Sequence, residues 1–404
     1  MSVLPTVPLG EVARFVRGIT FKPEDVVPVG GEASVACMRT KNVQVELDLA
    51  DVWGIPVTFV KREDQFLVDG DLLVSSANSW NLVGKCCWVP PLPWRATFGG
   101  FISVLRADRG RLDPRYLYHW FSSANVQAIV RSFGQQTTNI SNLNVERCLR
   151  LEVPLPTLDE QRRIAAVLDQ ADALRTKRRA ALAHLDALAQ SIFLEMFGDP
   201  ATNPKGWPTA RLGDVVAVNP RVSSQAVLGE HSADSLVAFV PMAAVSESKR
   251  RVTDYEMRAI GEVAKGYTPF QRDDVLLAKI TPCFENGKLC WVRDLPTAIG
   301  FGSTEFHVFR APDPCVARFV FSLLSLPDLR ERGARAMKGA AGQKRVPADF
   351  FADMKIPTPP ASLLAQLDAK CAAIDLLRDK ASTESVQLTD LFESLQHRAF
   401  RGEL

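Results

Sequence analysis

Two stretches of the chain carry apolar residues at alternating steps of three and four positions, which is the spacing of a coiled-coil seam. The seam of the first stretch consists of Ile164, Val167, Ala171, Leu174, Ala181, Leu185, Leu188 and Ile192. Arg178 interrupts this seam, and Thr157 with Glu160 forms a capping box at its start. The pattern predicts one helix over residues 157–197, about 60 Å long at about 1.5 Å per residue.

A second seam follows about 203 residues later and predicts a second long helix. It consists of Leu367, Ile374, Leu377, Ala381, Leu388, Leu391 and Leu395, with Lys370 and Glu384 as polar interruptions. Two helices with matching apolar stripes are expected to pair with each other. In an antiparallel pair Arg178 would best face Glu384, and this register sets Leu185 opposite Leu377.

The same offset relates segments outside the helices, so the repeat extends over the chain. Residues 71–89 align without a gap with residues 274–292, and residues 153–156 align with residues 356–359. Both copies contain short apolar runs of strand composition and one helix that begins with Asp-Pro. The fold class is therefore expected to be α+β: two homologous mixed α/β domains, separated by two long antiparallel coiled-coil helices in a pseudo-twofold repeat.

The repeat, together with the composition of the connecting segments, divides the chain into five segments. They are a mixed domain over residues 1–156, a central helix over 157–197, a Gly-, Pro- and Asn-rich linker over 198–206, a second mixed domain over 207–358 and a C-terminal helix over 359–404. Polar loops lie at corresponding places in the two domains and differ completely in sequence, while their flanking strands agree. A divergent loop on a shared scaffold suggests two sites of one kind that read different things.

The composition describes a soluble globular protein, with 47% hydrophobic and 23% charged residues. We expect no membrane span and no signal peptide, because long uncharged apolar stretches and a basic N-terminal region are both missing from the sequence. The eight cysteines lack C-x-x-C spacing, which favours a reduced, cytoplasmic protein without a zinc site. A net charge of +2 neither indicates nor excludes nucleic-acid binding.

Sequence motifs for catalysis are missing. There is no phosphate-binding G-x-x-x-x-G-K-[ST], no G-x-G-x-x-G after a strand, no H-E-x-x-H and no G-x-S-x-G. The Asn-Pro-Pro-aromatic signature of amino-methyltransferases is also missing, and the five histidines are scattered. We therefore expect no catalytic residue, metal ion or cofactor in this chain.

The candidate binding residues are polar or basic and lie at strand ends and in loops, where Asn and Gln can bond to adenine and Arg or Lys to guanine. In the first domain they are Arg39, Lys41, Asn42, Ser76, Asn78, Trp80, Asn81, Lys85, Gln135, Gln136, Thr137 and Asn139. In the second domain they are Lys279, Thr281, Asn286, Lys288, Ser303, Thr304, Gln343, Lys344 and Arg345. A basic run that suits phosphate contacts comprises Arg330, Arg332, Arg335, Lys338, Lys344 and Arg345. Solvated loops and a plain charged helix face are the alternative interpretations.

Four motifs together are highly specific. They are residues 154–161 (PLPTLDEQ), residues 278–288 (AKITPCFENGK), residues 300–306 (GFGSTEF) and residues 399–404 (AFRGEL). With these motifs the chain resembles the DNA specificity (S) subunit of type I restriction-modification systems over essentially its whole length. The entry to the second helix departs from the family pattern, because residues 359–366 (PPASLLAQ) lack the usual Glu-Gln.

The resemblance implies that each mixed domain is a target recognition domain for one half of a bipartite double-stranded DNA site, with the paired helices as a spacer. It implies two methyltransferase (modification) subunits, which use S-adenosylmethionine to methylate adenine, and motor-nuclease (restriction) subunits as partners. One alternative is a two-repeat coiled-coil scaffold that binds proteins rather than DNA. Another is a methyltransferase fused to its specificity domains, against which the missing motifs argue.

Overall fold

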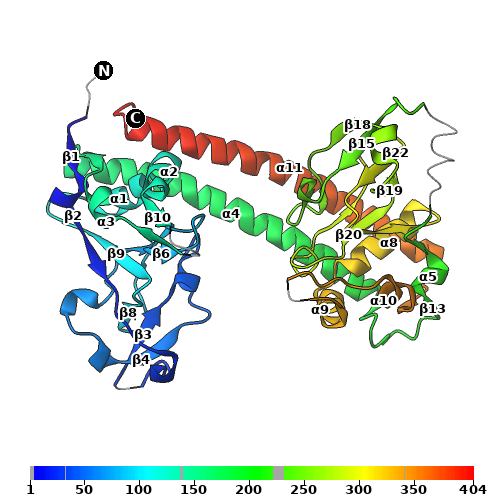
Figure 1. The fold of residues 1–404 in the computed structure, drawn as a ribbon, viewed down its shortest axis with the longest axis horizontal. Coiled ribbons are helices and arrows are strands. Elements are labelled where there is room, and N and C mark those ends of the chain that lie inside the picture. Colours follow the sequence, from blue (N-terminus) through cyan, green and yellow to red (C-terminus); the bar gives the residue numbers. More distant parts are fainter. Residues whose placement is uncertain (1–3, 32, 137–139, 222–231, 341) are drawn as a thin grey trace. The chain divides into compact units, whose positions relative to one another are not determined.

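The computed structural model of the chain describes residues 4–31, 33–136, 140–221, 232–340 and 342–404. The chain divides into two compact units: unit 1 comprises Met1–Arg179 and Thr383–Leu404, and unit 2 comprises Ala180–Ser382. Each unit contains one α+β domain and part of two long helices, α4 (Leu158–Phe197) and α11 (Ala361–Ala399) (Figure 1). The helix α4 begins one residue after the predicted cap, Thr157, whose hydroxyl accepts the Glu160 N–H at 3.4 Å.

The strands of unit 1 form small sheets. The largest pairs β2 (Ala13–Arg17), β9 (Ile102–Ala107), β5 (Leu72–Ser75) and β7 (Cys86–Trp88), in that order. The others are β4 (Trp53–Pro56), β3 (Ser34–Met38) and β8 (Ala96–Phe98); β10 (Gly134–Gln136), β11 (Ser141–Leu143) and β6 (Ala77–Asn78); and β1 (Thr6–Pro8) with β12 (Glu152–Pro154). The short helices are α1 (Pro114–Phe121), α2 (Ala124–Ser132) and α3 (Val145–Leu149).

The strands of unit 2 are arranged in a similar way. One sheet pairs β14 (Ala217–Val218), β23 (Phe306–Arg310), β20 (Val275–Ala278) and β21 (Leu289–Trp291). The others are β18 (Glu256–Ala259), β15 (Leu236–Val240), β22 (Ile299–Gly302) and β19 (Thr268–Gln271); β16 (Val245–Ser246) with β17 (Arg251–Val252); and β13 (Thr209–Arg211) with β24 (Lys355–Pro357). The short helices are α5 (Leu212–Val215), α7 (Ile260–Val263), α8 (Pro314–Leu324), α9 (Pro327–Ala336) and α10 (Ala348–Ala352).

The internal repeat is visible in strand order and in a buried ion pair. The order β2-β9-β5-β7 of unit 1 corresponds to β14-β23-β20-β21 of unit 2, and a parallel pair, β3–β8 or β15–β22, occurs in each. Arg106 binds Asp71 at 2.6 Å in unit 1, and Arg310 binds Asp274 at 2.7 Å in unit 2. Both aspartates are almost completely buried, at 1% and 2% side-chain exposure. The fold class predicted from the sequence repeat is thus confirmed within each unit.

An Asp-Pro pair starts the same helix in both units. Asp113 accepts two backbone N–H groups of the first turn of α1, and Asp313 does the same for α8. The buried face of α1 includes Tyr116 and Phe121, which pack into one core with the start of α4. Burying each such side chain contributes about 1.5–3 kcal/mol, so each domain is firmly fixed to the helix segment within its own unit.

The two long helices run antiparallel within each unit, as predicted. In unit 1 the Arg178 guanidinium lies 2.5 Å from the Glu384 carboxylate, and Arg163 donates to the Leu404 carbonyl at 3.1 Å. Residue numbers on α4 therefore increase as those on its partner decrease. In unit 2 Arg378 binds Asp186 at 2.6 Å, in the same sense. The predicted pairing of Arg178 with Glu384 is confirmed.

The predicted seam is only half right. Its first column is buried at Ile164 and Ile374 and half-buried at positions such as Leu185. The second buried column lies one residue later than predicted, at Leu168, Cys371 and Phe392. The predicted residues that are instead about half exposed are Leu174, Leu188, Leu377 and Leu391, at 53, 47, 57 and 52%. Leu377, which was predicted to lie opposite Leu185, is therefore mostly exposed, and the contact between these two leucines stays a prediction. The helices pack against the domain cores as well as against each other, which turns the buried side toward the domains.

By length and composition alone, α4 is apolar enough to cross a membrane, with a window of mean hydropathy 1.2. A helix in a soluble protein can pass the same test, so one such helix is weak support for a membrane span. Residues near both ends of α4, such as Leu168 and Phe193, pack into the domain cores, and 11% of the apolar window is buried.

Candidate nucleic-acid interface

A small antiparallel sheet in unit 1 gathers the polar residues predicted around the first divergent loop. The strand β11 pairs with β10 through Asn142 and Gln135, and with β6 through Ser141 and Asn78. Gln136 is also in β10, whereas Thr137 and Asn139 lie outside the described residues. Gln135 is exposed beside this sheet. The structure thus brings together two segments that are about 60 residues apart in the sequence.

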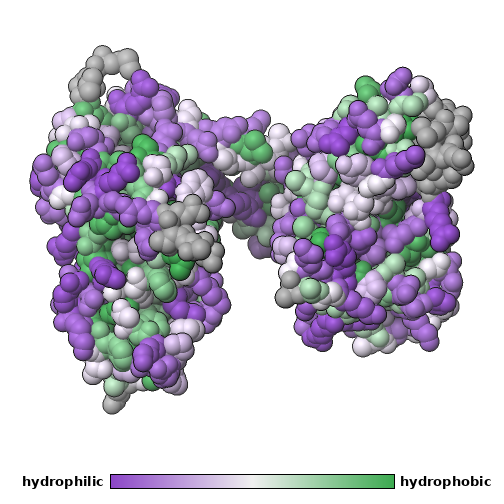
Figure 2. Space-filling model, viewed as in Figure 1, coloured by the Kyte–Doolittle hydropathy of each residue, from purple (hydrophilic) through white to green (hydrophobic). Residues whose placement is uncertain are grey.

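The turn after β6 presents an aromatic and an amide side chain. Trp80 is 49% exposed and Asn81 is exposed as well. The Asn78 amide donates to the Ser75 hydroxyl at 3.0 Å, and the Ser76 carbonyl accepts the Leu143 N–H at 2.9 Å. Asn78 and Ser76 therefore hold the turn in place, while Trp80 and Asn81 are accessible. Figure 2 shows hydrophobic residues exposed among hydrophilic ones on the face of each unit that it draws.

Asn42 is a wrong prediction, because it is completely buried. Its amide nitrogen donates to the carbonyls of Asp48 and Asp51 at 2.8 and 3.1 Å, and its oxygen accepts the Arg39 N–H at 2.8 Å. A polar residue after a strand can cap the following turn as readily as it can face a ligand. Asn42 belongs to the scaffold.

Arg39 and Lys41 are both committed to neighbouring groups. The Arg39 guanidinium stacks 3.6 Å from the Trp53 ring centroid and binds Asp51 at 3.1 Å. Lys41 binds the same carboxylate. The hydrogen bonds from Lys41 and then Arg39 lower the pKa of Asp51 below its usual value. Asp51 would have to release these cations before either could bind a phosphate.

The two lysines that follow the repeated glycine have one structural task in both units. Lys85 donates to the Gln44 amide oxygen at 2.7 Å. Lys288 donates to the Met242 carbonyl at 3.1 Å, lies 3.8 Å from Glu247 and is only 12% exposed. Each lysine fastens the loop after the first parallel strand, so neither is free to read DNA in this conformation.

In unit 2 the second divergent loop takes the place of the unit 1 hairpin. The backbones of Lys338 and Arg345 form an isolated antiparallel β-bridge. Arg345 forms a second such bridge with Ile280, beside the end of β20. The Thr281 N–H donates to the Lys344 carbonyl at 3.0 Å. This arrangement brings the candidate residues of the turn after β20 next to those of the loop. The exposed members are Asn286, Thr304, Gln343, Lys344 and Arg345.

The chemistry of this edge differs between the units at one position. In unit 2 the Glu305 carbonyl accepts the Lys279 N–H at 2.9 Å, and its carboxylate binds Arg345 at 2.7 Å. The Arg345 hydrogen bond lowers the pKa of Glu305, and the Ser303 hydroxyl accepts the Glu305 N–H at 3.2 Å. Arg345 is therefore bound to a carboxylate although its side chain is 43% exposed, while its exposed neighbour Lys344 has no ion pair among the described residues.

In unit 1 the same position is Phe101, which the sequence analysis missed. Its carbonyl accepts the Ser76 N–H at 3.0 Å, as that of Glu305 accepts Lys279, and its side chain is 62% exposed. An exposed phenylalanine beside polar side chains is suited to an apolar contact with a base. The signal was available, because Gly99-Gly100-Phe101 aligns with Ser303-Thr304-Glu305 of the second copy.

A neutral histidine supports the unit 2 edge from behind. His307 is 3% exposed, and its Nε2 donates to the Val346 carbonyl at 2.9 Å. Its Nδ1 accepts from the Asn219 amide at 3.0 Å. Desolvation lowers the pKa of His307 below its usual value. The uncharged ring therefore ties the residue after Arg345 to the core.

Within the parts of the chain that the structure describes, no group of three or more His, Cys, Asp or Glu side chains could hold a metal ion. The site consists of amides, hydroxyls, exposed aromatic rings and a few cations, carried on a hairpin or loop in each of two similar domains. These features define a class of protein: a repeated recognition scaffold with two related polar edges and paired long helices.

Residues 6–184 match the family model of the type I restriction modification DNA specificity domain. The match covers less than half of the chain, and it agrees with the resemblance seen in the sequence.

Named relatives extend the match. The chain is 34% identical over 198 residues to the type I restriction enzyme EcoEI specificity subunit of Escherichia coli, covering 48% of this chain and 32% of that protein. The chain thus spans about a third of the length of that relative. Against the type I restriction enzyme StySPI specificity subunit of Salmonella potsdam, identity is 20% over 99% of this chain and 89% of the relative.

The fold also matches a solved structure. A crystal structure of the S subunit of a type I restriction-modification system from M. genitalium aligns with a TM-score of 0.53. The alignment covers 99% of this chain and 96% of that one, at 14% sequence identity. Since identity is this low, the likeness supports the fold, and the function has to be argued from the site.

Proposed function

We propose that this chain is the DNA specificity subunit of a type I restriction-modification complex and reads a bipartite double-stranded DNA site. Each unit would read one half of the site through its divergent hairpin or loop. The observation that carries the proposal is the contrast within the repeat: the same strand order and buried ion pair support edges of unlike chemistry. A scaffold duplicated in this way can acquire two different sequence preferences while its fold is preserved.

The inventory at each edge supports direct readout of bases. Amide side chains such as Gln135 and Asn286 can bond to adenine, and an exposed lysine such as Lys344 can bond to guanine or to a phosphate. Trp80 offers a ring that can pack against a base. The proposed DNA-binding set is therefore narrower than the sequence suggested, since Asn42, Lys85 and Lys288 are engaged in the scaffold.

The long helices would space the two half-sites and bind the partner subunits. Both helices are continuous through the boundary between the units, so their length can set a fixed separation. The outward leucines at 174 and 188 on α4, and at 377 and 391 on α11, are each two heptads apart. Such columns are suited to binding further helices, one set on each long helix, which fits two modification subunits.

In this proposal the chain has no catalytic role. The modification subunits would bind S-adenosylmethionine and methylate adenine, and motor-nuclease subunits would join for restriction. We expect the complex to be cytoplasmic, because the chromosomal and incoming DNA on which it would act is in the cytoplasm. The rival function, a scaffold that binds proteins rather than DNA, predicts that the assembled complex does not shift a duplex in a gel.

The experiment that tests the proposal replaces residues 1–156 with the corresponding domain of a foreign specificity subunit. Methylated adenines are then mapped in cells that express the hybrid with its modification subunits. We expect one half of the methylated sequence to change and the other half to be retained. A change in both halves, or a protein that methylates no defined site in its native form, would contradict the proposal.

A further inference from the structure

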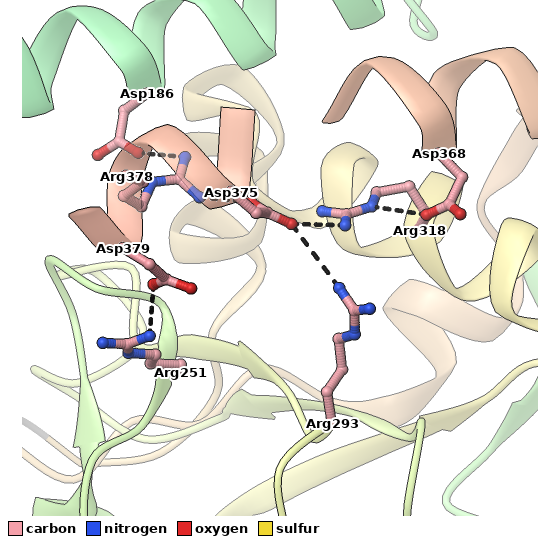
Figure 3. Close-up of polar contacts among 8 residues, drawn as sticks. All are labelled: Asp186, Arg251, Arg293, Arg318, Asp368, Asp375, Arg378 and Asp379. Carbon is pink, nitrogen blue, oxygen red and sulfur yellow. Dashed lines mark hydrogen bonds and ion pairs between the residues drawn. The ribbon is translucent and has the colours of Figure 1, made fainter. Parts of the chain in front are cut away.

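Where unit 2 packs against its segments of the long helices, arginines and aspartates form a set of ion pairs, five of which are connected through shared residues (Figure 3). The pairs are Arg251–Asp379 at 2.5 Å, Arg378–Asp186 at 2.6 Å, Arg378–Asp375 at 2.8 Å, Arg318–Asp375 at 2.6 Å, Arg318–Asp368 at 3.2 Å and Arg293–Asp375 at 3.9 Å. Each arginine in this set has a carboxylate partner, which offsets the cost of partly burying its charge.

Arg250 lies next to this set and is different. Its side chain is partly buried, yet it forms no hydrogen bond or ion pair with a residue that the structure describes. Its backbone has a φ of +49°, in the left-handed region that side chains other than glycine rarely adopt. Burial lowers the pKa of Arg250; Asp186 opposes this, while the like charges of Arg378 and Arg330 add to it.

Arg330 is the second cation at this place. It lies on α9 and packs over Gly287, so that its Nη1 would be only 2.2 Å from a Cβ atom at that glycine. Its guanidinium also has no hydrogen-bond or ion-pair partner within the described ranges. Arg250 and Arg330 line one enclosed space of about 10 Å³, which is room for a single water-sized group.

Among the residues described in unit 1, an apolar side chain takes the place of Arg330. The residue that packs over the equivalent glycine, Gly84, is Val130, whose Cγ1 would lie 2.6 Å from a Cβ there. The turn that carries Arg250 in unit 2 runs from Val245 to Val252, whereas the bridged turn of unit 1 runs only from Val43 to Leu47. The repeat packs this place with an apolar side chain in one copy and with two cations in the other.

We propose that Arg250 and Arg330 together bind one phosphate of the DNA backbone, beside the edge of unit 2 that reads bases. Two guanidiniums that share a space repel each other until an anion joins them, and guanidinium groups match phosphate oxygens in geometry. The space has room for one non-bridging oxygen between the two guanidiniums, and its other walls are mostly apolar. Gly287 follows Asn286, an exposed candidate for base contact, so the phosphate would fix the register of that turn. This inference rests on the proposed function.

The test uses the full chain assembled with its modification subunits and a duplex that contains its methylation site. Arg250→Gly removes the charge and relieves the left-handed backbone, and Arg330→Val restores the side chain of unit 1. We expect each variant to weaken DNA binding about tenfold and to reduce the salt slope by roughly one phosphate contact, about 0.9. The melting temperature of the free chain should stay the same or rise. An unchanged salt slope would overturn the inference.

Arg251→Ala is the matched control, because this neighbour has its own carboxylate in the protein. It should lower the melting temperature and leave the salt slope unaltered. A scan of the wild-type duplex with single neutral methylphosphonates should find one position that weakens binding as much as Arg250→Gly does. That position should cause no further loss in the variant; additive losses would contradict the assignment. If the wild-type complex does not bind its site specifically, the proposed function itself fails.

Discussion

The two units share a scaffold down to a buried ion pair, yet they differ where the scaffold meets solvent. Phe101 in unit 1 and Glu305 in unit 2 hold the same backbone hydrogen bond, but one is an exposed ring and the other binds Arg345. Val130 and Arg330 form a second such pair over equivalent glycines. The comparison shows that backbone hydrogen bonds preserve the conformation around Phe101 and Glu305, while the side chains at these positions differ between the units.

The strongest test of the comparison breaks the shared ion pair in each unit. Removing one partner of a buried pair costs about 3–5 kcal/mol, because the other charge is left unpaired. We expect Asp71→Ala and Asp274→Ala to reduce the free energy of unfolding by similar amounts. Hydrogen exchange should show the loss confined to β5 and β9 in the first variant and to β20 and β23 in the second. If one of the two substitutions left the free energy of unfolding unchanged, the ion pair would not stabilise both units in the same way.

A substitution at the exposed residue Phe101 should change DNA affinity and leave stability nearly unchanged. Phe101→Ala removes a ring that is 62% exposed, so the stability of unit 1 should change by no more than about 0.5 kcal/mol. If Phe101 contacts a base, DNA affinity should fall about five- to tenfold, as a loss of roughly 1–1.4 kcal/mol. Binding titrations with the specific duplex measure this, and Val45→Ala, another exposed apolar residue of unit 1, is the control. Equal affinities would remove Phe101 from the interface.

The histidine behind the unit 2 edge predicts a pH effect that unit 1 lacks. Because burial lowers the pKa of His307, the unfolded chain binds a proton below about pH 6.5 while the folded chain resists it. The stability from neutral His307 is complete above that pH and decreases as the pH falls toward the lowered folded pKa.

Urea unfolding of unit 2 at pH 7.5 and 5.5 measures this loss. His307→Ser places there the residue type of Ser103, its partner position in the repeat. We expect the variant to be less stable at pH 7.5 and less sensitive to acid. An undiminished acid effect would assign it to other groups.

The smallest predicted effect is a change in the salt dependence of DNA binding, which should distinguish an exposed lysine from one that is hydrogen-bonded within the protein. Lys344→Ala should reduce the salt slope of DNA binding by about 0.9 if that side chain binds a phosphate. Lys85→Ala should leave the slope unchanged, because Lys85 is bonded to Gln44. A reversed result would mean that the loops rearrange on DNA and exchange their roles.

Much of the fold could be predicted from the sequence because both copies of the repeat carry the same pattern of elements. The offset between copies located both long helices, and the polar interruptions at Arg178 and Glu384 gave the register that the structure has. The second seam column could not be predicted, because it depends on cores assembled from distant segments. Leu168 and Phe392 are buried against the unit 1 domain, which displaces the outward column to Leu174 and Leu391.

The candidate site was harder to predict, for a physical reason. Asn and Lys after a strand can cap a turn, fasten a loop or face a ligand, and only the folded neighbours decide between these roles. Asn42 and Lys85 were therefore assigned to the wrong role, whereas Trp80 and Lys344 are exposed as expected. Phe101 was overlooked because an apolar residue after Gly-Gly was interpreted only as part of a strand.

The measurement that tests the account most directly removes one heptad from both long helices at facing positions, residues 179–185 and 377–383. The spacer should shorten by about 10 Å, or roughly 3 bp of duplex at 3.4 Å per base pair. Mapping methylated adenines should then yield the same two half-sites with a gap about three base pairs shorter. Methylation of the original spacing by a stably folded variant would contradict the claim that the paired helices set the distance between the half-sites.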